Sequence, residues 1–135
     1  MKILITGAQG FVGSNLFLGL KKDYKIIGIG RKNKNFISRD KRIVEKKITY
    51  KNLVSLSFEP ELIIHCAGSG SVSRSIQDQK LDYDKNVNTT KELINFISNL
   101  KNKPKVIVFS SAAVYGNSCT KNKKKLKPIS PYGKN

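Results

Sequence analysis

Three glycines near the N-terminus have the spacing of a phosphate-binding turn. Gly7, Gly10 and Gly13 recur at three-residue intervals between a short apolar run and a helical pattern. Glycine lets the backbone turn tightly and approach a ligand, and a following helix N-terminus offers N–H groups and a positive dipole end. Glycines also make simple turns, but this strand-to-helix context favours phosphate binding, with Gly13 allowing the helix to pack closely on the strand.

Two hydroxyl side chains near the other end of the sequence could orient or transfer protons. Ser111 lies in the segment SSAAVYG over 110–116, and Tyr132 follows Pro131. A free tyrosine has a pKa of about 10 and is a poor base at neutral pH, so proton transfer would need a nearby positive charge. Taken singly, Ser111 is better interpreted as a cap at a strand end and Tyr132 as an aromatic residue at a helix start.

Apolar runs alternate with helical patterns along the chain, and these elements must position the glycines and hydroxyls. The strands are uniformly apolar, which is typical of strands buried on both faces. We therefore predict an α/β fold of right-handed βαβ units, with a doubly wound parallel sheet in the strand order 3-2-1-4-5, covered on both faces. The predicted strands span 2–6, 25–30, 42–48, 61–67 and 105–110, and the predicted helices follow the glycine turn and span 50–56 and 83–100.

Two of the predicted helices carry an apolar stripe that should face the sheet, because residues three or four apart lie on one side of a helix. The stripes consist of Val12, Leu16 and Leu20 in the first helix and of Val87, Thr90, Ile94 and Ile97 in the helix over 83–100.

Length and composition indicate one soluble folded domain. The chain has 135 residues, of which 39% are hydrophobic and 26% charged, as expected for a globular protein. No apolar run approaches the length of a membrane span, and Gly7 and Gly10 interrupt the first run before a signal-peptide core forms. We predict a cytoplasmic protein with no membrane partner.

The formal net charge of +17 raises the possibility of a nucleic-acid partner, because cations gain affinity by releasing counterions from phosphates. The lysines are scattered, however, and only four residues are arginine. The densest basic run, 121–127, has Leu126 as its only apolar member and contains no aromatic residue for stacking on bases. We therefore predict a solvated basic surface with no nucleic-acid partner; a nucleic-acid binder would show a steep salt dependence.

The cysteines and the single histidine give no sign of a disulfide framework or a metal site. Cys66 and Cys119 are too few for four-ligand zinc binding, and Cys66 lies in an apolar run as a small buried residue would. His65 is the only histidine, which excludes a His-rich metal site and predicts a packing residue at a strand end.

The G-x-x-G-x-x-G spacing resembles that of the short-chain dehydrogenase/reductase superfamily, and Phe11 after the second glycine is similar to its extended branch, the NAD-dependent epimerases and dehydratases. This resemblance implies a Rossmann-like NAD(P)-binding domain over 1–135, incomplete on its C-terminal side, from a sugar-nucleotide epimerase, dehydratase or reductase. The other segments that match, in order, are HCAG (65–68), NVNT (86–89), SSAAVYG (110–116) and PISPYGK (128–134).

The resemblance implies roles for particular residues. Tyr132 would be the catalytic acid/base and Ser111 the hydroxyl that hydrogen-bonds the reacting sugar oxygen, while a lysine and the oxidised nicotinamide would lower the pKa of the tyrosine. The residues implied for cofactor binding are Gly7, Gly10, Phe11, Val12, Gly13, Arg31, Lys32, Ile48, Ala67, Gly68, Asn86 and Ser110.

Two departures from the family pattern affect the cofactor. An acidic residue after the second strand normally binds the adenosine ribose and favours NAD, but Arg31 and Lys32 stand here. A guanidinium suits a 2′-phosphate, so we expect NAD or NADP, with NADP preferred. Where the family often has an Asp after the third strand, the chain has Lys46, Lys47 and Ile48, so adenine should contact Ile48 and the backbone.

A third departure concerns catalysis. The family's lysine falls four residues after the tyrosine, at position 136, and Lys134 points to a different side of the helix. We therefore expect a cofactor-binding part without turnover, whose nucleotide-sugar substrate would be held by a C-terminal domain absent from this sequence. A non-catalytic NAD(P)-binding module is the alternative. The resemblance also implies a homodimer of the full-length form through the helix over 83–100 and the helix near Tyr132.

Overall fold

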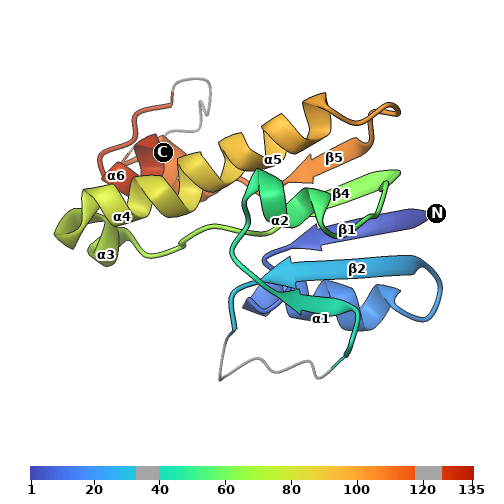
Figure 1. Cartoon of the computed structure of the whole chain (residues 1–135). Coiled ribbons are helices and arrows are strands. Elements are labelled where there is room, and N and C mark those ends of the chain that lie inside the picture. Colours follow the sequence, from blue (N-terminus) through green and yellow to red (C-terminus); the bar gives the residue numbers. More distant parts are fainter. Residues whose placement is uncertain (33–39, 118–125) are drawn as a thin grey trace. The chain divides into compact units, whose positions relative to one another are not determined.

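The computed structural model describes residues 1–32, 40–117 and 126–135, and Figure 1 traces the chain. The chain divides into two compact units. The sheet unit comprises residues 1–67 and 89–108, and the helical unit comprises residues 68–88 and 109–135.

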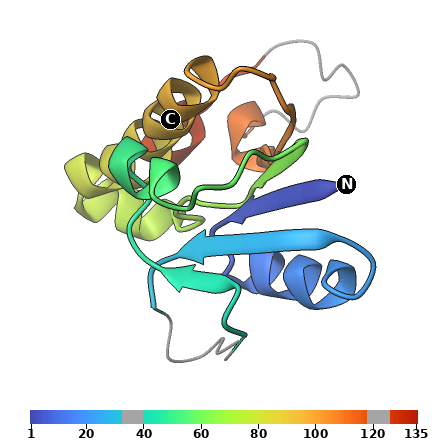
Figure 2. The ribbon, with the colours of Figure 1, turned by 45° about the vertical axis from the view of Figure 1, so that its right-hand side comes forward.

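The sheet unit contains a five-stranded parallel sheet, in which β1 lies between β2 and β4 (Figure 2). Its strand order is β3-β2-β1-β4-β5, which confirms the predicted doubly wound order. The register places Thr6, at the end of β1, opposite Ile29 in β2 and His65 in β4, so these strands end together. The strands are β1 (Lys2–Thr6), β2 (Lys25–Gly30), β3 (Ile43–Glu45), β4 (Leu62–His65) and β5 (Lys105–Val108).

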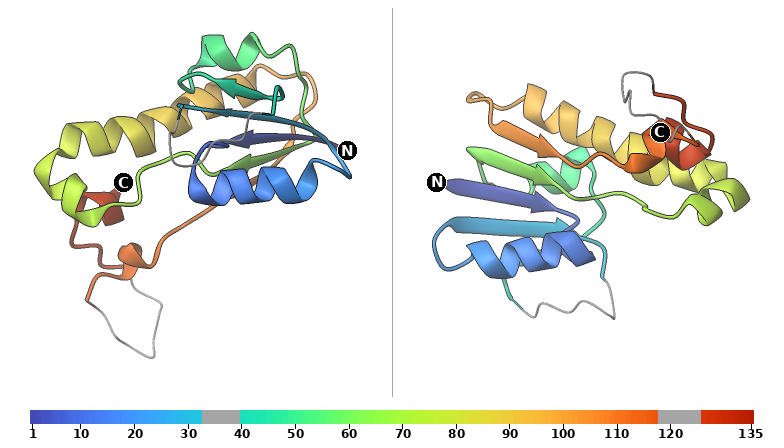
Figure 3. Two further views of the ribbon diagram at one scale, coloured as in Figure 1. Left: turned by 90° about the horizontal axis from the view of Figure 1, so that it is seen from below. Right: turned by 180° about the vertical axis from the view of Figure 1, so that it is seen from behind.

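Helices cover both faces of this sheet, as the views in Figure 3 show. Helix α1 (Phe11–Leu20) packs on one face, and α2 (Tyr50–Val54) and α5 (Thr89–Ser98) pack on the other. Successive side chains of a strand point to opposite faces, so Ile3 and Ile5 join the core around α1 while Leu4 joins the core around α2 and α5. Two separate cores therefore account for the uniformly apolar strands.

The face that α1 buries differs from the predicted stripe. Gly13, Ser14 and Phe17 are the buried residues, whereas Val12 is exposed. The reason is the contact of Gly13 with the preceding turn, described below, which rotates the helix so that Phe17 enters the core. Leu16 and Leu20 lie at the margin of this core.

The predicted helix over 83–100 was wrong in its start and in its buried face. The helical segment begins with α4 (Gln79–Tyr83), passes through the π-helix η1 (Asp84–Asn88) and continues as α5. A π turn holds more residues than an α turn, so the helical phase changes between Val87 and the residues that follow. In α5 the residues that are buried are Thr89, Leu93 and Phe96, while Ile94 is exposed.

Strand β5 also differs from the prediction of a sheet covered on both faces. Its side chains Val106, Ile107 and Val108 are all exposed. The strand is the last in the sheet order, and its side chains belong to neither of the two core clusters that the helices cover. Its apolar sequence therefore predicted the strand correctly but not its burial.

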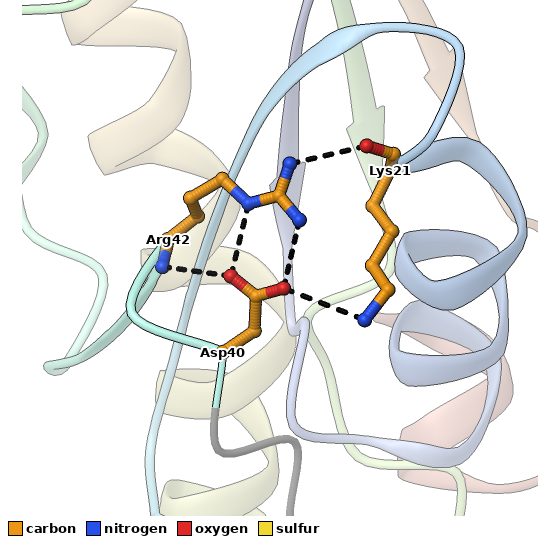
Figure 4. Close-up of polar contacts among 3 residues, drawn as sticks. All are labelled: Lys21, Asp40 and Arg42. Carbon is orange, nitrogen blue, oxygen red and sulfur yellow. Dashed lines mark hydrogen bonds and ion pairs between the residues drawn. The ribbon is translucent and has the colours of Figure 1, made fainter.

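An ionic cluster joins the start of β3 to the end of α1 (Figure 4). Arg42 donates to both oxygens of Asp40, at 2.9 and 2.8 Å, and to the backbone oxygen of Lys21 at 3.1 Å. The Lys21 ammonium lies 3.5 Å from the same carboxylate, and the guanidinium of Arg42 lies over the Phe17 ring. The hydrogen bonds from Arg42 hold the pKa of Asp40 well below its usual range. These basic residues thus have a structural role.

The helical unit is built from short segments. It contains α3 (Val72–Gln77), which the sequence did not predict, together with α4, η1, the 3-10 helix η2 (Ala112–Tyr115) and α6 (Pro131–Lys134). Ser71, Asp78 and Ser130 cap α3, α4 and α6 by accepting from backbone N–H groups. Helices this short are marginal by themselves, so caps and tertiary contacts must hold them.

The buried face of α5 can be tested with two neighbouring residues. Leu93 is 2% exposed and Ile94 is 59% exposed. We expect L93A to lower the free energy of unfolding by about 2–5 kcal/mol, because it leaves a cavity in the core, and I94A to change it by less than about 1 kcal/mol. Denaturant unfolding measures the stability of both variants. A larger loss of stability in I94A than in L93A would favour the apolar stripe predicted from the sequence, which contains Ile94.

Candidate functional site

The glycine turn between β1 and α1 has no room for a side chain at Gly7 or at Gly13. Gly7 adopts a φ of +70°, in the left-handed region, and a Cβ there would lie 2.7 Å from the backbone of Cys66 and Ala67. A Cβ on Gly13 would lie 2.3 Å from the Gly7 oxygen, and the Gly10 N–H donates to that same oxygen at 2.9 Å. The turn, the end of β4 and the first turn of α1 are therefore packed backbone against backbone.

The N-terminus of α1 has the features of an anion site. Gly10 is its N-cap and provides no side-chain hydrogen bond, and the first turn contains no acidic residue. Phe11 and Val12 are exposed. A helix N-terminus without a side-chain cap presents N–H groups and a positive dipole end to an anion, so this turn fits a pyrophosphate.

Two basic residues follow the end of β2. A Cβ on Gly30, the last residue of this strand, would lie 3.3 Å from the backbone nitrogens of Ala8 and Gln9, so the strand end lies against the glycine turn. Arg31 and Lys32 follow directly and are both exposed. The carboxyl end of β2 therefore carries positive charge beside the turn.

Two other predicted cofactor residues lie at the core of the sheet unit. Ile48 is 6% exposed and belongs to the core cluster around α2 and α5. Ala67 is partly buried against the same cluster. The Ile48 side chain thus packs inside the protein, and a ligand contact at this position would have to come from the backbone.

His65 ties the ends of β1 and β4 to α5, and the sequence analysis did not identify its partners. Its Nδ1 shares a 2.6 Å hydrogen bond with the Thr6 hydroxyl, and its Nε2 lies 3.0 Å from the Thr90 hydroxyl. The ring is buried, as predicted for a packing residue, and burial lowers its pKa from the ordinary 6.5. His65 is therefore neutral at physiological pH and holds two strand ends beneath the glycine turn.

The neighbouring cysteine is not a reactive thiol. Burial raises the pKa of Cys66 to about 11, and only the thiolate is a good nucleophile. Its side chain packs at the edge of the core around α1. Cys119 lies outside the described residues.

In the helical unit, Ser111 and Tyr132 lie on elements that contact each other. A Cβ on Gly133 would lie 2.6 Å from the backbone oxygen of Ala113, so α6 and η2 meet within two residues of Ser111 and of Tyr132. The Ser111 hydroxyl accepts from the Ala113 N–H at 3.2 Å and caps η2. A hydroxyl can donate once and accept twice, so this cap leaves hydrogen-bonding capacity for a substrate oxygen.

The segment after β4 is held by the π-helix. The Asn86 side-chain oxygen accepts from the Ser69 N–H at 2.8 Å, and a Cβ on Gly68 would lie 2.8 Å from that oxygen. π-turns inside helices often occur at functional sites. Ser110, predicted to line the cofactor, is exposed at the start of the helical unit's second segment.

Residues 3–135 match the NAD dependent epimerase/dehydratase family. The chain belongs to this family. It is 33% identical over 129 residues to a UDP-glucose 4-epimerase of Mycoplasma genitalium, covering 85% of this chain and 37% of that protein. It is 31% identical to UDP-glucose 4-epimerase 2 of Oryza sativa subsp. japonica, covering 98% and 37%. The predicted resemblance is confirmed.

Solved structures of epimerases share the fold. UDP-glucose 4-epimerase of Brucella ovis in complex with NAD matches with a TM-score of 0.85 and 27% identity, over 98% of this chain and 43% of that one. The Thermotoga maritima enzyme with UDP-glucose matches with a TM-score of 0.85 and 26% identity, over 99% and 47%. The chain spans less than half the length of these relatives.

The predicted site residues are divided between the two units of the chain. Nine of the predicted cofactor residues, from Gly7 to Ala67, lie in the sheet unit, and Gly68, Asn86, Ser110, Ser111 and Tyr132 lie in the helical unit.

Within the described part of the chain, no helix is long and apolar enough to cross a membrane.

The close contact at Gly13 predicts a selective effect on cofactor binding. We expect G13A to weaken NADH binding at least about tenfold, since the added methyl would push α1 off the glycine turn and displace its N–H groups. Gly19 is the control in the same helix, because a Cβ there meets nothing within 4 Å; G19A should keep the affinity and stabilise the fold by up to about 1 kcal/mol. Fluorescence titration with NADH measures the affinity of each variant. Equal NADH affinities of G13A and the wild type would contradict the expectation.

Burial of neutral His65 predicts a pH-dependent stability. Because its pKa is lowered in the folded chain, the unfolded chain binds the proton more readily. The contribution of neutral His65 to the free energy of unfolding is therefore complete above pH 6.5 and is lost as the pH falls below that value. We expect the free energy of unfolding to decline between pH 7 and 5 in the wild type and to decline less in H65Q. If the free energy of unfolding falls equally with pH in the wild type and in H65Q, then His65 does not cause the pH dependence.

Proposed function

We propose that the protein containing this chain moves hydride between NAD(P) and the sugar ring of a nucleotide sugar, as an epimerase, dehydratase or reductase. The observation that carries the proposal is the side-chain-free contact between Gly7 and Gly13, which leaves the start of α1 open to a pyrophosphate. The UDP-glucose 4-epimerases among the relatives support a UDP-hexose as the substrate class.

The cofactor would be held mainly by backbone groups of the glycine turn. N–H groups at the start of α1 would bind the pyrophosphate, and the glycine turn would let the rest of the molecule approach the backbone closely. NAD(P), when bound, would supply the group that accepts a hydride from the sugar carbon or donates one to it.

Ser111 and Tyr132 would handle the proton that accompanies the hydride. When a carbon bearing a hydroxyl loses hydride, the hydroxyl proton must leave as well. The Tyr132 phenolic oxygen takes this proton, or returns it in the reverse direction, while the Ser111 hydroxyl orients the sugar oxygen. A neighbouring cation must favour the phenolate, because the pKa of a free tyrosine is about 10.

NADP is the preferred form of the cofactor in this proposal. Arg31 and Lys32 lie beside the glycine turn at the end of β2, where a guanidinium would bind a 2′-phosphate. Dissociation constants for NAD and NADP, measured on the chain, test this preference. Tighter binding of NAD would contradict it.

Turnover tests the proposed function itself. We expect the complete gene product to convert a nucleotide sugar such as UDP-glucose and to lose about 10²–10⁴-fold of its kcat in Y132F, because the phenolic proton is removed. Y24F removes the hydroxyl of a tyrosine just before β2, at the opposite end of that strand from the glycine turn, and should keep full activity. Cofactor binding without conversion of any nucleotide sugar would instead support a non-catalytic NAD(P)-binding module.

A further inference from the structure

We propose that Asp82 is a positioning residue that holds the helix carrying Tyr132 in a fixed place relative to the segment at Gly68 and Ser69. The importance of Tyr132 rests on the proposed function; the connection itself rests on hydrogen bonds within the helical unit. Nothing in the sequence singled out Asp82, which lies in a polar stretch of the chain.

Asp82 is a buried carboxylate with two amide donors from different elements. It lies in α4 and is 3% exposed. One of its oxygens accepts from the Asn86 side chain at 3.1 Å, and the other accepts from the Asn135 side chain at 2.9 Å. A buried charge is costly unless it is hydrogen-bonded, so the carboxylate favours the arrangement in which both amides reach it.

The hydrogen bonds continue beyond Asn86. The oxygen of this same side chain accepts from the Ser69 N–H at 2.8 Å. An amide that donates through its nitrogen and accepts through its oxygen has a fixed orientation. Asn135, Asp82, Asn86 and Ser69 therefore form one connected path from α6 through α4 and η1 to the segment after β4.

Helix α6 depends on this path because it is only one turn long. The segment Pro131–Lys134 is too short to be stable alone, so its position is set by its contacts. One is the backbone contact of Gly133 with Ala113, and another is the hydrogen bond from Asn135 to Asp82. Asn135 follows Tyr132 by three residues, a spacing that keeps both on neighbouring parts of one helix face.

Changing the two side chains, singly and together, tests this role. In D82A, both acceptor oxygens of the carboxylate are lost. In N135D, two carboxylates face each other. We expect the Gly133 and Lys134 amides to exchange with solvent about tenfold faster in each single variant, because α6 opens more often. Hydrogen exchange followed by NMR on the labelled chain measures these rates.

The double variant D82N/N135D should reverse the effect. The amide introduced at position 82 can accept from Asn86 and donate to the carboxylate introduced at position 135, so both hydrogen bonds form again. We expect exchange at Gly133 and Lys134 to return to within about twofold of the wild type. The Leu4 amide in β1 should keep its rate in all three variants, which separates local opening from global unfolding.

N135S provides a second test should D82A fold poorly. It removes the hydrogen bond to α6 but leaves the pair formed by Asp82 and Asn86, so Gly133 should exchange faster while Ser69 keeps its rate. The proposal is overturned if the double variant exchanges as fast as the single variants, or if N135S leaves Gly133 unchanged. A wild-type chain that binds neither NADH nor NADPH would reject the proposed function and leave this connection standing.

Discussion

The approach of Gly13 to the Gly7 carbonyl is the contact on which the rest of the sheet unit depends. No side chain fits between these residues, so α1 starts directly against the strand end. The contact directs the uncapped N-terminus of α1 toward the turn, and it rotates the helix so that Phe17 fills the core. Gly30 brings the end of β2 to the same turn. One steric constraint therefore sets both the position of the α1 N-terminus and the packing of the first βαβ unit.

The strand order was predictable because each strand carries its own signal. A parallel strand buried on two faces reads as an apolar run, and the short connections with fixed handedness leave few topologies. Helix faces were less predictable, since an apolar stripe assumes one uniform period. The π turn at 84–88 breaks that period before α5, and the Gly13 contact overrides it in α1. The exposure of β5 depends on which strands the helices cover, and residue types alone do not reveal this.

In the candidate site, too, features formed by residues close in sequence were predictable, whereas contacts between residues far apart in sequence were not. The glycine turn is recognisable because its three residues are close in sequence and rare in this pattern. The partners of His65 could not be found this way, since Thr6 lies 59 residues away and threonine is common. Asp82 and Asn135 are 53 residues apart and belong to no spacing pattern. Pairs of ordinary polar residues become significant only when the fold buries them together.

The two units hold their predicted site residues by different physical means. In the sheet unit the backbone itself is close-packed, so steric contacts hold the glycine turn, and a substitution of one of its glycines would disturb it most. In the helical unit Ser111 and Tyr132 lie on single helical turns that side-chain caps and amides hold in place. Hydrogen bonds between side chains are individually worth about 0.5–3 kcal/mol, so the hydroxyl groups are the more easily displaced. Cofactor binding should therefore tolerate sequence change outside the glycines, whereas the geometry around Tyr132 depends on its buried polar neighbours.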